Sequence, residues 1–186
     1  MKKWLAIITR IIAVISSFLL VLKILIRFLN FRYFRIEVLG LSMVPSLHSK
    51  DYLIVEKSDG TSIHPPASIV VMQDSDNNIF LKRIIGMPGE SIQVGDEVRI
   101  NGKILIERYA WGGTPNSRYR GVNRLAQDEY FLIGDNRSVS KPDSRDFGPV
   151  TKSRILGKVI YRYWPPARIG KFKPEIRKFE PTDEEN

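Results

Sequence analysis

The sequence predicts a mainly β domain that follows a single N-terminal transmembrane helix. An apolar stretch near the N-terminus is long enough to cross the hydrocarbon core of a bilayer. Beyond Arg35 the chain changes to short runs rich in Ile, Val, Tyr and Phe, interrupted by Gly, Pro, Asn and Asp, and this pattern is typical of β-strands. The 186 residues are enough for one domain of ordinary size plus an appendage. We therefore expect a membrane anchor at 1–32 (transmembrane at about 5–29), a β domain at 33–170, and a charged, poorly ordered C-terminal tail at 171–186.

The N-terminal stretch is interpreted as an uncleaved anchor. Residues 11–22 carry no charge, and a mostly apolar window of about twenty residues, which is the length that spans a bilayer, fits either 4–22 or 11–29. Lys23 and Arg27 lie toward the end of the second window, where long cationic side chains can reach the interface. No A-x-A-like site follows, which favours an anchor over a cleavable signal peptide. A helix that lies in the membrane interface is the alternative. Because basic residues stand on both sides of the stretch, the positive-inside rule does not decide its orientation.

Short segments of strand-like composition make up the rest of the chain. Asn101-Gly102 between two of them is a strong hairpin signal, because a type I′ turn needs positive φ at both central residues. We find no convincing amphipathic helix beyond the anchor, and the polar, Gly- and Arg-rich residues 110–125 are expected to form a surface excursion. The expected strands are 36–39, 52–56, 68–73, 79–85, 97–100, 103–106, 130–133 and 154–163.

The composition restricts the possible chemistry. A formal charge of +9 favours an anionic partner, and because much of this charge lies in the N-terminal segment, anionic lipid is favoured over nucleic acid. The absence of cysteine excludes disulfides, thiolate nucleophiles and Cys-ligated zinc. Only two histidines occur, so a His-rich metal site is excluded as well. Both His48 and His64 are expected at the surface, which leaves no plausible histidine base.

A serine in the stretch LGLSMVPSL is a candidate nucleophile. Ser42 stands two residues after a glycine and two residues before the Val-Pro bond of a Met-x-Pro sequence. Ser, Gly and Pro are also ordinary turn residues, so this stretch taken alone favours a purely structural turn. The chain has no G-x-S-x-G sequence, and a Ser–His–Asp triad is therefore not indicated.

A lysine in the run NNIFLKRIIGMPGE is a candidate base. Side chains alternate along a strand, so Lys82 shares its face with Phe80 and Ile84, while Arg83 points to the other face. Burial among apolar groups lowers the pKa of a lysine, and a neutral lysine is a competent general base. A lysine that reaches water from an edge strand is the alternative. Together, a serine and such a lysine form a known variant of the nucleophile–base pair.

Four motifs give the chain, from about Tyr33 to Tyr163, a resemblance to type I signal peptidases, the membrane-bound serine proteases of family S26. GLSMVPSL resembles the nucleophile box S-M-x-P-T-L, with Ser46 where Thr is common, and KDYLIVEK resembles the strand that follows it. FLKRIIGMPGE resembles the base box, with Glu90 where Asp is common. GDNRSVSKPDSRDFGPV resembles the third signature, G-D-N-R-x-x-S-x-D-S-R. Each motif alone is a weak to moderate signal, but the four in this order behind an N-terminal anchor are very specific.

The resemblance implies a fold and a set of site residues. The fold is the β-ribbon of coiled antiparallel sheets that signal peptidases share with self-cleaving repressors. Ser42 matches the nucleophile, with its own amide as oxyanion donor, and Lys82 matches the general base. Gly40 stands where some members carry a second, hydroxyl donor, so such a donor would have to come from elsewhere.

The third motif departs from the family's spacing. Asp143 and Arg145 match a pair that supports the active site, but five residues, 138–142, separate GDNR from DSR where the family usually has four. Counted from GDNR, the serine that holds the catalytic lysine is Ser140, and counted back from DSR the same place falls on Lys141. We favour Ser140, with Ser138 as the fallback.

The resemblance also implies a function and a location. It predicts a Ser–Lys endopeptidase that removes signal peptides from exported preproteins after A-x-A-type sites, without cofactor or metal. The protein would be a single-pass monomer in the bacterial plasma membrane, with its catalytic domain on the extracytoplasmic side. Three alternatives stay open: a pilus-processing or other specialised S26 peptidase, a catalytically inactive membrane-tethered β-domain, and a nucleic-acid-binding protein, which no basic motif with interleaved aromatics supports. Self-cleaving repressors carry a DNA-binding helix-turn-helix, where this chain has an anchor.

Overall fold

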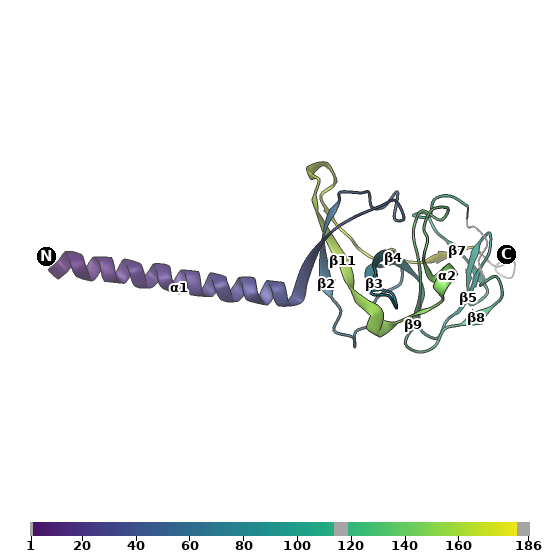
Figure 1. Ribbon diagram of the computed structural model, residues 1–186, viewed down its shortest axis with the longest axis horizontal. Coiled ribbons are helices and arrows are strands. Elements are labelled where there is room, and N and C mark those ends of the chain that lie inside the picture. Colours follow the sequence, from purple (N-terminus) through teal and green to yellow (C-terminus); the bar gives the residue numbers. More distant parts are fainter. Residues whose placement is uncertain (1, 114–118, 182–186) are drawn as a thin grey trace. The chain divides into compact units, whose positions relative to one another are not determined.

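A computed structural model describes residues 2–113 and 119–181 of the chain. By compactness the chain divides into Met1–Phe34 and Arg35–Asn186. The first unit contains one uninterrupted helix, α1 (Lys2–Arg32), which Figure 1 shows in purple. Its segment Arg10–Arg32 has a mean hydropathy of 2.4 and is long and apolar enough to cross a membrane. The predicted N-terminal apolar helix is therefore present.

The second unit consists mainly of two antiparallel sheets. The larger has the strand order β1-β2-β11-β3-β4-β9-β10, with β12 pairing with β11, and the smaller has the order β13-β7-β6-β5-β8. The predicted mainly β, antiparallel fold class is confirmed. The strands of the larger sheet are β1 (Tyr33–Glu37), β2 (Tyr52–Lys57), β3 (Ile69–Gln73), β4 (Ile79–Gly86), β9 (Glu129–Ile133), β10 (Val150–Thr151), β11 (Ile155–Trp164) and β12 (Gly170–Lys171). Those of the smaller sheet are β5 (Ser91–Val94), β6 (Val98–Ile100), β7 (Lys103–Ile106), β8 (Asn123–Arg124) and β13 (Lys178–Phe179).

The helical elements of the second unit are short. The helix α2 (Ser144–Phe147) begins with a capping box in which Asp143 is the N-cap residue and Asp146 reaches back to its backbone. Two single-turn 3₁₀ helices, η1 (Lys152–Arg154) and η2 (Pro166–Arg168), flank β11. The Asn101-Gly102 turn joins β6 to β7 with positive φ at both residues, as the sequence predicts.

Strand β4 separates two hydrophobic clusters because its side chains alternate between its two faces. Ile85 belongs to a cluster in which apolar residues of the smaller sheet meet Phe131 and Ile133 of β9. Ile84 belongs to the other cluster, with Tyr130 and Leu132 of β9. Figure 1 shows β3, β4 and β9 in the middle of this β region. A side chain at position 82 or 83 of β4 is consequently carried into the interior.

The C-terminal tail differs from the expectation. The part of the expected tail that is described, residues 171–181, is not poorly ordered, since Lys178–Phe179 pairs with β7 and Phe179 packs against the first hydrophobic cluster. Residues 182–186 lie outside the described part of the chain. Arg177 forms an ion pair with Glu90 at 2.5 Å and donates to the Ile85 carbonyl. The high charge of this segment suggested that it would stay in solvent. Instead, Arg177 is paired with a carboxylate, and the Phe179 ring packs against apolar residues.

The two histidines also differ from the expectation of a surface position. His64 is only 6% exposed, and its ring lies beside that of Tyr130, with ring centroids 6.2 Å apart. Its Nε2 lies 3.1 Å from the Ser58 hydroxyl, and its backbone N–H donates to the Tyr130 hydroxyl. Burial, followed by the charges of neighbouring lysines, lowers the pKa of His64. His48 is partly buried.

Candidate active site

Ser42 lies near the start of a loop, residues 38–51, that is closed at its base by backbone hydrogen bonds. The Val38 amide donates to the Asp51 carbonyl at 2.8 Å. Inside the loop, the Leu47 amide donates to the Met43 carbonyl at 2.8 Å, and both side chains are buried in the domain. These apolar anchors fix the backbone while leaving Ser42 only half-buried. The loop therefore presents a hydroxyl from a firmly held turn.

Lys82 is buried on β4, as the alternation pattern predicts. Its side chain is 1% exposed, and its Nζ lies 5.6 Å from the centre of the Phe80 ring. Nζ donates a hydrogen bond to the Ser140 hydroxyl at 3.0 Å. Burial lowers the pKa of Lys82 from 10.5 to about 8, with Asp143 opposing the shift and Arg145 adding to it. A substantial fraction of this amine is therefore neutral at a mildly alkaline pH.

The third motif surrounds the lysine with a buried polar network. Ser140 Oγ donates to Asp143 Oδ2 at 2.8 Å while it accepts from Lys82. Arg145 binds both oxygens of Asp143, at 2.9 and 2.8 Å. Burial disfavours the charged carboxylate of Asp143, but the hydrogen bonds and charge of Arg145 more than compensate and lower its pKa. The network gives the Ser140 oxygen a fixed orientation toward the amine.

The structure places the three candidate residues of the third motif in different surroundings. Ser140, counted from GDNR, is the residue that the structure brings to Lys82. Lys141, the residue counted from DSR, is exposed. The fallback residue Ser138 donates instead to the side chain of Asn136, at 3.1 Å.

Gly134 brings the Ser42 loop and the Lys82 network together. A Cβ added there would lie 2.1 Å from Ser140 Oγ and 2.5 Å from the Ser42 carbonyl oxygen, so both groups press against this one backbone position. The Asn136 amide also donates to the Ser42 carbonyl at 3.0 Å. Within residues 2–113 and 119–181, no hydrogen bond joins the Ser42 hydroxyl to the Lys82 amine. Catalytic hydrogen bonds are often long in enzymes without substrate and shorten in the Michaelis complex.

A groove with a volume of about 370 Å³ runs past Ser42. Its walls are the end of β1 with the segment that follows it, and the first half of β4. Leu39 on the rim is 78% exposed. Such a groove accommodates an extended chain beside the hydroxyl. It is lined by Ile36, Glu37, Val38, Leu39, Gly40, Ser42, Met43, Ile79, Phe80 and Leu81.

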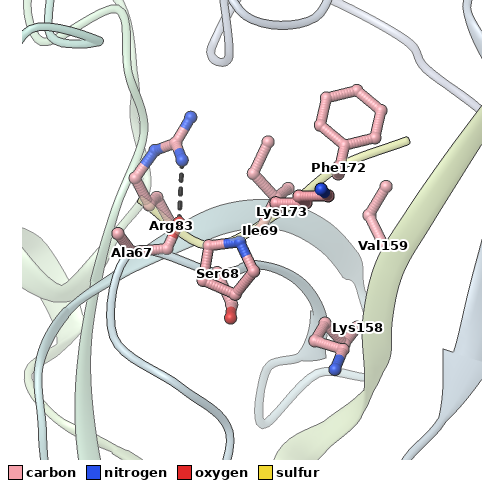
Figure 2. Close-up of a pocket in the computed structure, with 9 residues that line it drawn as sticks. Ala67, Ser68, Ile69, Arg83, Lys158, Val159, Phe172 and Lys173 are labelled. Carbon is pink, nitrogen blue, oxygen red and sulfur yellow. Dashed lines mark hydrogen bonds between the residues drawn. The ribbon is translucent and has the colours of Figure 1, made fainter. Parts of the chain in front are cut away.

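A second pocket is much smaller and lies between β3, β11 and the segment after β12. Its volume is about 20 Å³, which is close to the room that one water molecule needs. Figure 2 shows Phe172, Val159 and Lys158 around it, and Arg83 hydrogen-bonded to Ala67 at one side. This pocket is too small for a peptide side chain. Another pocket, of about 350 Å³, lies in the smaller sheet and is lined by neither Ser42 nor Lys82. The groove at Ser42 is the candidate active site because it contains the candidate nucleophile.

Sequence reasoning missed the buried partners of the residue next to the lysine. Arg83 binds both carboxylate oxygens of Asp135, at 2.7 and 2.6 Å, and both side chains are buried. The alternation pattern placed Arg83 on the face opposite Lys82 but gave no indication of its partner. One signal for this pair was available in the sequence. Arg83 is a charged residue on an apolar strand face and needs a carboxylate partner, and the GDNR motif offers Asp135. Among the described residues, no group of three or more His, Asp or Glu side chains is arranged to hold a metal ion.

The comparisons with known proteins agree with these motifs. The family model described as signal peptidase, peptidase S26, matches residues 7–164. Signal peptidase I of Leptolyngbya laminosa is 37% identical over 144 residues, covering 72% of this chain and 70% of that protein. Signal peptidase I of Bacillus amyloliquefaciens is 31% identical over 162 residues, covering 82% of this chain and 86% of that protein. A solved signal peptidase I from Enterococcus faecalis is similar with 30% identity and a TM-score of 0.41, covering 52% of this chain and 98% of that one. On the family model and the two sequence relatives, the chain belongs to the signal peptidase family, peptidase S26.

Proposed function

We propose that this protein is a membrane-anchored endopeptidase that removes signal peptides from exported preproteins with Ser42 as nucleophile and Lys82 as general base. One observation carries the proposal: a lysine amine, 1% exposed and with its pKa lowered to about 8, lies in the network that abuts the Ser42 backbone. A buried lysine without a paired carboxylate of its own is costly, and it is rarely retained for stability alone. Membership of the family supports the removal of signal peptides.

In the proposed mechanism, Lys82 accepts and returns the protons that are transferred in each step. Neutral Lys82 takes the hydroxyl proton of Ser42 as Oγ attacks the scissile carbonyl. The Ser42 amide donates to the developing oxyanion, and loss of one such donor typically costs about 10²–10³ in rate. The ammonium of Lys82 then returns its proton to the leaving amine, which produces an acyl-enzyme. Lys82 next activates a water that hydrolyses the ester and restores the Ser42 hydroxyl.

The groove supports binding of the substrate in an extended form. Residues 36–40 form one wall and Ile79–Leu81 the other, so a peptide between them can pair its backbone with strand-like neighbours. Small side chains of an A-x-A-type site would fit shallow depressions beside Ser42. The anchor α1 would hold the enzyme at the membrane where signal peptides also reside, which raises the effective concentration of the substrate.

The same proposal includes the location. The enzyme is placed in the bacterial plasma membrane as a monomer with a single span, and its β domain lies on the extracytoplasmic side, where the cleavage sites of exported preproteins emerge. The basic residues on both sides of the apolar stretch do not determine this sidedness, and it follows from the family's function. Its partners are preproteins and the lipid bilayer, without nucleic acid or cofactor.

The test is cleavage of a preprotein with an A-x-A site by the full-length protein in phospholipid vesicles. Wild type is expected to release the mature protein with an N-terminus directly after the site, and Ser42→Ala is expected to release none. N-terminal sequencing of the product identifies the bond that is cut. If folded wild type cuts no such preprotein, the inactive-domain alternative gains support. Cleavage of pilin precursors alone would instead support the specialised-peptidase alternative.

The rate of cleavage is expected to rise with pH around a midpoint near 8. The active form requires a neutral Lys82, and burial lowers the pKa of Lys82 to about 8, so kcat/KM should increase as the proton leaves and level off above that pH. The measurement is kcat/KM between pH 6 and 10 with a short A-x-A peptide in detergent micelles. A profile that falls across this range, or that rises only near the ordinary lysine pKa of 10.5, would contradict a desolvated lysine base.

Ser140→Ala is expected to reduce kcat by about 10- to 100-fold, because the Lys82 amine loses the acceptor that orients it. Ser138→Ala is the matched control two residues away, since its hydroxyl bonds to Asn136 and not to the amine. It should retain activity within about twofold of wild type on the same physical grounds. Steady-state assays on both variants decide the assignment: a larger loss in the Ser138 variant would reverse it.

A further inference from the structure

Ser46 is held from two sides by arginines that come from different strands. Arg83 of β4 donates from Nη2 to the Ser46 hydroxyl at 3.0 Å. Arg162 of β11 donates from Nη1 to the Ser46 carbonyl at 3.2 Å. Ser46 is four residues beyond Ser42 in the same loop. The loop of the proposed nucleophile is thus tied to the sheet through one residue.

The first arginine is rigidly fixed. Arg83 is 5% exposed, and its guanidinium donates to Asp135 twice and to the Ala67 carbonyl at 2.8 Å, the latter visible in Figure 2. The Tyr109 ring covers it, with a ring centre 4.1 Å from Cζ. Arg83 is the residue directly after Lys82 in β4. Its hydrogen bond to Ser46 therefore connects the loop that carries Ser42 to the strand that carries Lys82.

The second arginine is fixed by a fully buried carboxylate. Asp51 is 0% exposed and accepts from Arg162 at 3.0 Å, while Arg168 forms an ion pair with it at 2.8 Å. The His48 amide donates to the same carboxylate at 3.0 Å. Asp51 closes the base of the 38–51 loop, so its bond with Arg162 holds the loop against β11. The loop consequently cannot move away from either strand without losing charge-assisted hydrogen bonds.

We propose that Ser46 is a positioning residue: its hydroxyl, bound to Arg83, sets the separation between the Ser42 hydroxyl and the Lys82 amine. This inference rests on the proposed function. No direct hydrogen bond between those two groups fixes their distance in the described part of the chain, so the surrounding frame must do so. Displacement of a reacting group by about 1 Å can cost about 10²-fold in rate. A substitution at Ser46 removes the hydrogen bond from Arg83 to the Ser42 loop and leaves the buried ion pair of Arg83 with Asp135 in place.

The test compares Ser46→Val with Ser46→Thr, which have the same shape and differ by the hydroxyl. Ser46→Thr is expected to keep kcat within about threefold of wild type, and Ser46→Val to lose about 10- to 100-fold in kcat. KM should stay within about twofold in both, because Ser46 is not among the residues that line the groove. Equal kcat values for the two variants, whether both are high or both are low, would overturn the proposal.

Hydrogen exchange provides a readout that does not depend on catalysis. The amides of Val44 and Leu47 are bonded within the loop, and in Ser46→Val they should exchange about 10-fold faster than in wild type or Ser46→Thr. Unchanged exchange in the valine variant would overturn the proposal even if kcat fell. If wild type cleaves no preprotein, the proposed function fails, and exchange still shows whether the tie exists.

Ser62→Ala is the matched control. The Ser62 hydroxyl also bonds to a charged partner, Asp59, at 2.8 Å, but it lies in an exposed turn that does not line the groove. Its loss should leave both kcat and loop exchange unchanged. A decrease in kcat with Ser62→Ala as large as that with Ser46→Val would show a nonspecific effect and refute the positioning role.

Discussion

Lys82→Arg is expected to abolish preprotein cleavage, with kcat/KM reduced by about 10⁴-fold or more. Arginine keeps the positive charge and can still donate to Ser140, but it does not lose its proton at usable pH and so cannot accept one from Ser42. The larger guanidinium also enters a site where Arg145 is already close. Cleavage of a fluorogenic A-x-A peptide, followed for long enough to detect very slow turnover, measures the loss.

Two further variants separate catalysis from folding. Lys82→Met has a similar length without a charge, so it should fold at least as stably as wild type and be equally inactive, since it lacks a base. Lys158→Arg changes a half-buried lysine of β11 whose ion pair with Glu56, at 3.6 Å, tolerates a guanidinium, and it should remain active. Circular dichroism on each variant confirms the fold. An active Lys82→Arg enzyme would refute the assignment of the base.

Gly134→Ala is expected to damage both activity and stability. The new Cβ would meet Ser140 Oγ at 2.1 Å and the Ser42 carbonyl oxygen at 2.5 Å, and the second of these belongs to backbone that cannot rotate away. Overpacking of this kind typically costs about 1–3 kcal/mol of unfolding free energy. Because the shift displaces the proposed nucleophile and the proposed holder of the base together, kcat should fall by about 10²-fold or more. Thermal denaturation and steady-state kinetics measure the two effects.

Gly121→Ala provides the control for this substitution. A Cβ at Gly121 meets no atom within 4 Å, so stability should change by less than about 0.5 kcal/mol and kcat should not change. If Gly134→Ala behaved like Gly121→Ala, the close approach of the Ser42 and Ser140 segments at this glycine would be wrong.

The sequence predicted best those features that depend only on neighbouring residues along one strand or turn. Alternation along 79–85 places Lys82 on an apolar face, and the structure has it buried beside Phe80. The Asn101-Gly102 turn likewise needs only local backbone chemistry. The expected strands mostly coincide with observed ones within one to three residues, but β5 (Ser91–Val94) and the two-residue strands β8, β10, β12 and β13 were missed. In β5, Ser and Gln alternate with only two apolar side chains, and two residues carry no periodicity at all.

Features that depend on the register of distant segments could not be predicted in the same way. The spacing of the third motif left Ser140 and Lys141 as competing choices. In the folded loop after β9 the Ser140 amide donates to the Asn136 carbonyl at 2.8 Å, and it is the Ser140 side chain that meets the amine. The partner of Arg83 lies 52 residues away at Asp135. His64 was expected at the surface because its neighbours in sequence are turn residues, whereas Tyr130, 66 residues away, buries it. The catalytic roles of Ser42, Lys82, Ser140, Asp143 and Arg145 stay predictions until the variants are assayed.

The short strand β13 has a consequence for solubility. It covers the outer hydrogen-bonding edge of β7, and the Glu180 amide extends this pairing to the Ile104 carbonyl. An uncovered edge strand offers unpaired amides and carbonyls to another copy of the chain, and natural proteins reduce this hazard with very short, charged edge segments. Lys178 and Glu180 on either side of Phe179 provide such charges. The C-terminal segment therefore protects the smaller sheet against self-association, in addition to completing its core.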